Sequence, residues 1–256
     1  MNLGGPRPWQ PLATGAVVAG AGLAAAGGVG LLLPLPALGA SLGYVGGAAV
    51  IVAYWHRRRF GAANLVTLGR VVGTSWVIGL TLQALLGRLT PGGLLAMVVV
   101  GTCCLVLDGV DGAVARARGE SSAFGARFDM ETDAALLMAL SLAVPALGIA
   151  GWWVLAIGGL RYGYVAAGWI APRRIRTALR MPLPYHYSRK VVAVIQGVSL
   201  LTALALELTG VAEAVPALPP TLLAASLVTL VWSFGRDIVW QLRAAREGRL
   251  RVGSLS

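Results

Sequence analysis

The chain has 256 residues, of which 57% are hydrophobic and only 12% are charged, and its formal net charge is +11. A soluble domain carries about twice that charged fraction. The apolar residues here gather in uncharged blocks long enough to cross a bilayer, which takes roughly 20 residues per helix, so an ordinary soluble domain is excluded. The basic residues lie beside these blocks, a placement that fits a membrane protein better than a nucleic-acid groove.

The pattern of apolar blocks predicts an all-α fold, a polytopic transmembrane helix bundle with eight spans. Prolines, glycines and charged stretches separate the spans. The uncharged run from 134 to 160 is too long for one untilted crossing, so we divide it at Pro145, Gly148 and Gly151. The expected spans lie near residues 11–33, 37–55, 64–86 and 93–116, then two between 124 and 172, then 191–206 and 221–234.

The distribution of arginine predicts the topology. If the cluster at 57–59 faces the cytoplasm, the 116–127 loop, the 173–190 connection and the C-terminal tail face it too, and nearly every Arg lies on that side. We therefore expect a multi-pass protein of the cell membrane with both termini in the cytoplasm. The expected segments are an N-terminal pair of transmembrane helices (1–60), a core (61–240) and a basic, partly helical cytoplasmic tail (241–256).

Carboxylates are concentrated in one stretch, because six of the ten acidic residues lie between Asp108 and Asp133. Asp108 and Asp111 are three residues apart and Asp129 and Asp133 are four apart, and on a helix either spacing puts both members on one face. The first pair ends the fourth span and the second begins the fifth. We expect these helices to be antiparallel neighbours, so that four carboxylates converge at membrane depth.

Four converging carboxylates would repel one another and lose hydration, at a cost that divalent cations remove. Oxygen ligands select a hard ion, so Mg²⁺ or Mn²⁺ is expected and zinc is not. Four carboxylates suit two ions about 3.5–4 Å apart, the arrangement used in phosphoryl chemistry.

Small residues flank the carboxylates. Gly112, Ala115 and Gly125 have almost no side chain, so either a nucleotide diphosphate can approach the helix backbone there or two helices can pack tightly. Arg116, one turn beyond Gly112, can contact a phosphate or the neighbouring carboxylates.

The stretch from 108 to 133 resembles the signature of the CDP-alcohol phosphatidyltransferase (CDP-alcohol phosphotransferase) family. That signature is D-x-x-D-G-x-x-A-R, about eight residues, then G-x-x-x-D-x-x-x-D. A second match lies at 64–70, where family members often carry P-N-x-x-T followed by Arg, and where Ala63 here replaces the proline. The six-helix family core would cover about 60–240, with the first two spans as an addition. The matched signature positions are Asp108, Asp111, Gly112, Ala115, Arg116, Gly125, Asp129 and Asp133.

The resemblance implies a transferase of phospholipid biosynthesis, which moves a phosphatidyl group from CDP-diacylglycerol or a related CDP-alcohol to an alcohol acceptor and releases CMP. It implies that Asp108, Asp111 and Asp129 are metal ligands and that Asp133 is both a ligand and the base on the acceptor hydroxyl. The expected nucleotide-binding residues are Asn64, Thr67, Gly112, Ala115, Arg116 and Gly125. The resemblance also implies a homodimer, with membrane lipids as further partners.

The acceptor site is less sharply marked. Arg189, Lys190 and Arg236 lie at the cytoplasmic ends of the last two spans, and family members with phosphorylated polyol acceptors have a basic pocket in this region. These three residues are therefore the acceptor-binding candidates, although each also fits ordinary positive-inside charge. Glycerol 3-phosphate and inositol 1-phosphate are the favoured acceptors, and a cardiolipin-type or serine acceptor stays open.

Two other interpretations compete with this one. A non-enzymatic cation transporter could use the aspartates as its ion path, but it would not need the glycines and Arg116 of the signature. A family member that binds a CDP-lipid without turnover would not need the complete set of aspartates. Arg161 lies within a membrane span, where an Arg is costly, so we expect it to face a polar cavity or an ionic partner.

Overall fold

The computed structural model describes the core of the chain and fragments of the N-terminal region. Within the described ranges all regular structure is helical, which confirms the all-α fold class, and four helices are long and apolar enough to cross a membrane. The described backbone comprises residues 12–13, 15–17, 37, 39–41, 43–45, 62–118, 123–179 and 187–253. Only the backbone is described at 62–65, 110–118, 123–127, 173–174, 179, 187 and 246–253.

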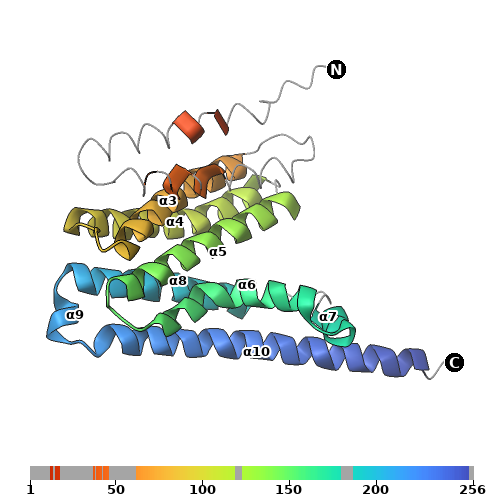
Figure 1. Ribbon diagram of the computed structural model, residues 1–256. Helices are drawn as coiled ribbons and strands as arrows, with labels where there is room; N and C mark the ends of the chain where they lie inside the picture. Colours follow the sequence, from red (N-terminus) through yellow and green to blue (C-terminus); the bar gives the residue numbers. More distant parts are fainter. Residues whose placement is uncertain are drawn as a thin grey trace, which may run out of the picture.

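Long helices build the bundle, with shorter ones in the connections (Figure 1). In chain order they are α3 (Ala62–Leu85), α4 (Pro91–Arg118), α5 (Ala123–Ala146), the 3-10 turn η1 (Trp152–Val154), α6 (Leu155–Ile170), α7 (Arg173–Leu179), α8 (Tyr187–Leu208), α9 (Val211–Ala214) and α10 (Leu218–Gly253). The four membrane-span candidates are Val66–Leu85, Pro91–Gly109, Ser188–Leu208 and Leu218–Ala245.

Helix α3 packs against both α4 and α5, and α8 contacts α4, α5 and α10. Met97 of α4, Leu140 of α5 and Leu200 of α8 are fully buried in the apolar core where the helices meet. Short stretches of sequence connect α3 to α4 and α4 to α5, so successive helices run antiparallel (Figure 1). The start of α3, the end of α4 and the start of α5 therefore lie at one end of the bundle.

The break expected at Pro145, Gly148 and Gly151 is confirmed, because α5 ends at Ala146 and α6 follows after η1. Gly148 has a positive φ of 75°, a conformation that glycine adopts without a steric penalty. The amide of Ile149 donates to the carbonyl of Val144 at 3.1 Å, which closes the last turn of α5.

The last helix extends well beyond Phe234, where the last membrane span was expected to end, and includes most of the tail that was expected to be partly helical. Helix α10 is continuous from Leu218 to Gly253, so the expected boundary between core and tail at 240/241 lies inside one helix. A single glycine at 235 does not end the helix, and the part of α10 that qualifies as a candidate membrane span continues to Ala245. The basic connection at 173–190 likewise contains α7, which packs against α10.

The described fragments of the N-terminal region pack against α3. The hydroxyl of Tyr44 donates to the carbonyl of Leu12 at 2.7 Å, which ties together the two segments predicted as helices. Gly39 and Gly43 are four residues apart, and a Cβ added at Gly43 would lie 3.0 Å from Cδ1 of Ile78 in α3. Small residues at this spacing let two membrane helices approach closely, so this region braces α3 from outside the core.

A glycine also sets the distance between α5 and α6. A Cβ added at Gly158 of α6 would lie 2.6 Å from the Cα and 2.9 Å from the backbone nitrogen of Met138 in α5. Backbone atoms of a packed helix cannot move aside as a flexible side chain can, so the two helices would have to separate. Gly163, on the same helix, has no atom within 4 Å of an added Cβ.

We predict that Gly158→Ala lowers the thermal unfolding midpoint in detergent by about 2–10 °C, the shift expected from about 1–3 kcal/mol of overpacking. Gly163→Ala, the matched control, should leave the midpoint unchanged or slightly raised. Fluorescence-monitored melting of both variants measures this, and equal midpoints for the two would contradict the described packing of α5 on α6.

Candidate active site

Three carboxylates from two helices meet at one end of the bundle. They belong to Asp108 of α4 and to Asp129 and Asp133 of α5, and one oxygen of each lies within 4.8 Å of the others. Their side chains are 16%, 35% and 38% exposed, respectively, so the group is open to solvent on one side. The structure thus brings together three of the four aspartates that the spacing predicts to converge.

The guanidinium of Arg70, from α3, lies among these carboxylates. Its Nη1 is 3.2 Å from Oδ1 of Asp108 and also donates to Oδ1 of Asp129, while its Nη2 donates to Oδ1 of Asp133. Arg70 is only 1% exposed. Three helices therefore contribute charged groups to one cluster, and among its described side chains three carboxylates surround the guanidinium of Arg70.

Arg70 was not among the residues predicted for this site. The available signal was its spacing from Thr67, since residues three apart share a helix face and Thr67 was already expected at the nucleotide. Thr67 is buried at 4% exposure, one turn from Arg70 on α3. That spacing identifies the face of α3 but does not show that this face meets the aspartates of α4 and α5.

Several predicted site residues lie where only the backbone is described. The helical backbone of α4 continues through Arg118, which keeps Asp111 one turn beyond Asp108. The side chains of Asn64, Asp111, Gly112, Ala115, Arg116 and Gly125 lie outside the described part, so their expected roles stay predictions.

Two acceptor candidates are held by one carboxylate that the sequence analysis missed. Nε of Arg189 in α8 is 2.7 Å from Oδ2 of Asp237 in α10, and Nη2 of Arg236 is 3.4 Å from Oδ1 of the same residue. Arg236 also donates to the hydroxyl of Ser188 at 3.1 Å. Lys190 is exposed and makes no ion pair with a described residue, so the structure brings Arg189 and Arg236 together without it.

Arg161 of α6 has an ionic partner, as we expected for this residue. Its Nη2 is 2.7 Å from Oε1 of Glu131, and the pair joins α6 to α5. Glu131 lies between Asp129 and Asp133 in sequence, yet it pairs with α6 while they pair with Arg70 of α3. Glu131 therefore belongs to the opposite face of α5 and not to the carboxylate cluster.

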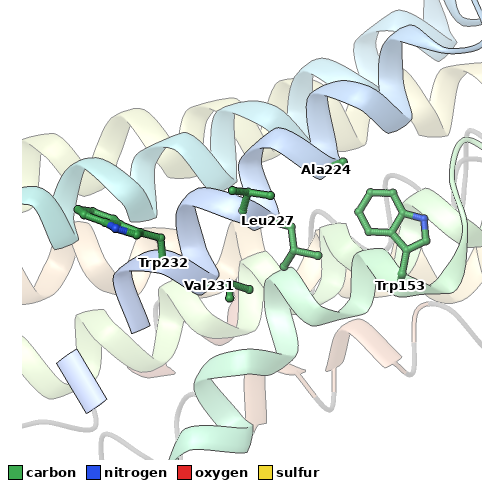
Figure 2. Close-up of a pocket in the computed structure, with 6 residues that line it drawn as sticks. Trp153, Ala224, Leu227, Val231 and Trp232 are labelled. Carbon is green, nitrogen blue, oxygen red and sulfur yellow. The ribbon is translucent and has the colours of Figure 1, made fainter. Parts of the chain in front are cut away.

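An apolar groove of about 490 Å³ lies elsewhere, between η1 and α10. Trp153 and Trp232 stand at opposite ends of a row that includes Leu227 and Val231 (Figure 2). None of its lining residues comes from α3, α4 or α5, so the groove is separate from the carboxylates, and its lining has no acidic or basic side chain.

The donor set of the cluster fits a hard divalent cation. Its three donors are carboxylate oxygens, the ligands that Mg²⁺ and Mn²⁺ prefer. Oxygens on opposite sides of a Mg²⁺ ion lie about 4.2 Å apart, at about 2.1 Å from the metal each. A spread of 4.8 Å is therefore close enough for one ion to bind all three after a small adjustment.

A family model described as CDP-alcohol phosphatidyltransferase matches residues 60–232, more than half of the chain. The matched segment includes Arg70, the three clustered aspartates and Arg189, while Arg236 lies just beyond it. Searches of curated proteins and of solved structures found no match.

We predict that Asp129→Asn weakens Mn²⁺ binding at least about tenfold, because it removes one negative charge and one ligand oxygen. Glu131→Gln is the matched control on the same helix and should bind Mn²⁺ as the parent protein does. Titration followed by electron paramagnetic resonance of free Mn²⁺ measures both. Equal losses in the two variants would show that the cluster is not the metal site.

Proposed function

The chain belongs to the CDP-alcohol phosphatidyltransferase family, and we propose that it transfers a phosphatidyl group from CDP-diacylglycerol or a related CDP-alcohol to an alcohol acceptor, with release of CMP. The observation that carries this proposal is the meeting of Asp108, Asp129 and Asp133 at one end of a membrane helix bundle. A divalent cation needs such a concentrated set of oxygen ligands, and the cation in turn would attract the diphosphate of the donor.

In the proposed reaction, the acceptor oxygen attacks the phosphorus that carries the lipid, and the bond from that phosphorus to the CMP oxygen breaks. Asp133 takes the proton of the acceptor hydroxyl. With 38% of its side chain exposed, Asp133 is open to an incoming alcohol. The products are a phosphodiester and CMP.

We assign Asp108, Asp111, Asp129 and Asp133 as the metal ligands, for two ions of Mg²⁺ or Mn²⁺. When bound, the metal supplies charge neutralisation for the diphosphate and for the departing CMP. The residues proposed to hold the nucleotide are Asn64, Thr67, Gly112, Ala115, Arg116 and Gly125. Thr67 is buried one turn from Arg70 on α3, which supports its place in this group.

A phosphorylated acceptor suits the second charged group. Arg189 and Arg236 come from different helices and both contact Asp237, so their guanidinium groups are held near each other. Two fixed guanidinium groups favour a phosphate over a neutral or zwitterionic acceptor. Glycerol 3-phosphate and inositol 1-phosphate are therefore favoured over serine, with Lys190 as a further contact at the surface.

The four apolar helices indicate a multi-pass membrane protein. We propose that the carboxylate end of the bundle faces the cytoplasm and that the protein resides in the cell membrane. Support comes from the arginines of α7 and of the C-terminal part of α10, because these segments lie at the same end of the bundle as the end of α4 and the start of α5 (Figure 1).

The test is CMP release by the purified full-length protein in detergent, with Mg²⁺ or Mn²⁺, CDP-diacylglycerol and a panel of acceptors. We expect release to require one acceptor, with glycerol 3-phosphate and inositol 1-phosphate the first to try. Asp133→Asn should lower the rate about 100-fold or more, since it removes the proton acceptor. Glu131→Gln should keep most of the activity.

No CMP release with any acceptor, or equal rates for Asp133→Asn and the parent protein, would refute the proposed function. Mn²⁺ flux into protein-containing liposomes without CMP release would instead favour a cation transporter.

A further inference from the structure

Arg70 stands out because a guanidinium at 1% exposure is costly inside a membrane protein unless it is compensated. Its compensation comes from two neighbouring helices at once, Asp108 of α4 and the pair Asp129 and Asp133 of α5. By comparison, Arg161 of α6 is 26% exposed and its ion pair within the described part of the chain is with one carboxylate, that of Glu131. The contrast indicates that Arg70 acts on the whole cluster.

The same contacts also stabilise the three carboxylates, and not only the buried guanidinium. Three carboxylates with oxygens within 4.8 Å repel one another and would spread apart if no positive charge stood among them. The planar guanidinium can meet several carboxylates because its two Nη atoms donate in different directions, which a lysine ammonium on a flexible stem does less well. Arg70 contacts one oxygen, Oδ1, of each of the three carboxylates.

We propose that Arg70 is a positioning residue of the carboxylate site, an internal counter-cation that keeps Asp108, Asp129 and Asp133 assembled. This proposal rests on the proposed function in one respect, namely that a divalent cation binds to these carboxylates. Because Arg70 and the divalent cation neutralise the same negative charges, each weakens the other's interaction with the cluster. Arg70 thus holds the site in a binding-ready geometry while limiting how tightly the metal binds.

This role has a signature that ordinary packing lacks. Removing the charge of Arg70 should tighten Mn²⁺ binding, because the remaining cluster is more negative. Loss of this charge should also make folding depend on Mn²⁺. A ligand that binds only the folded state stabilises that state, and the stabilisation grows with the affinity. A side chain that merely fills space between α3, α4 and α5 would leave the Mn²⁺ affinity unchanged or lower it.

The experiment compares Arg70→Gln, Arg70→Lys and the control Arg161→Gln in the full-length protein in detergent. Mn²⁺ alone is the probe, titrated by electron paramagnetic resonance, and melting is measured with EDTA and with saturating Mn²⁺. For Arg70→Gln we expect a Mn²⁺ dissociation constant lowered at least about fivefold. In EDTA, the melting midpoint of Arg70→Gln should lie below that of the parent protein. In saturating Mn²⁺, the difference between the two midpoints should disappear.

The two comparison variants separate charge from shape. Arg70→Lys keeps the charge, so its Mn²⁺ dissociation constant should stay within about threefold of the parent value. Arg161→Gln removes a positive charge of α6 that pairs with Glu131 on the opposite face of α5, and it should leave the Mn²⁺ affinity unchanged.

Weaker or unchanged Mn²⁺ binding by Arg70→Gln, or a melting gap that is the same with and without Mn²⁺, would overturn the proposal. Failure to recover Arg70→Gln even when it is purified in Mn²⁺ would also overturn it, since the ion should replace the lost charge. None of these measurements needs turnover. A parent protein that releases no CMP would therefore refute the proposed function and leave the counter-cation result standing.

Discussion

Electrostatic repulsion among three carboxylates at one end of a helix bundle is the constraint on which the rest of this structure depends. Asp108, Asp129 and Asp133 lie close enough to share a ligand, and such a group persists in a weakly polar setting only with positive charge beside it. Arg70 supplies one such charge from a third helix. Helices α3, α4 and α5 must therefore be held in fixed register for the site to exist.

The packing of the bundle provides that register. Small residues allow close approach, as at Gly158 between α5 and α6 and at Gly43 against α3. Away from the site, Gln196 of α8 accepts from the hydroxyl of Ser226 in α10 at 2.6 Å and donates to that residue's carbonyl at 3.0 Å. A buried amide satisfied on both its oxygen and its nitrogen orients two membrane helices specifically. The chemistry thus gathers at one end while apolar packing and a few hydrogen bonds fix the rest.

Much of the site was predictable because helical periodicity converts sequence spacing into geometry. The three- and four-residue spacings of the aspartates predicted shared faces, and a short connection predicted antiparallel helices whose aspartates lie at one end of the bundle. The expected direct packing of these two helices differs from the structure, where α3 and α8 each contact both α4 and α5. Arg70 and Asp237 were missed for the same physical reason. Arg70 contacts carboxylates of two other helices, and Asp237 contacts a guanidinium group of another helix. Periodicity within one helix shows which residues share a face, but it does not show which helix that face contacts.

The length of α10 was missed for a different reason. Hydrophobicity reports where a helix leaves the membrane, whereas the helix itself ends only where backbone hydrogen bonding stops. The charged sequence after Phe234 contains good helix formers and no proline, so α10 runs on to Gly253. By contrast, Gly148 supplies a local backbone signal, a left-handed conformation that ends a helix, and the break after α5 was predictable.

The most direct test of the central claim is an experimental structure of the full-length protein with Mn²⁺, in which anomalous scattering locates the ion. The account predicts a Mn²⁺ peak about 2.2 Å from carboxylate oxygens of Asp108, Asp129 and Asp133. It also predicts that Arg70 remains beside the cluster, with fewer or longer contacts to those oxygens. A peak bound by other residues, or three aspartates pointing away from one another with Mn²⁺ present, would contradict it.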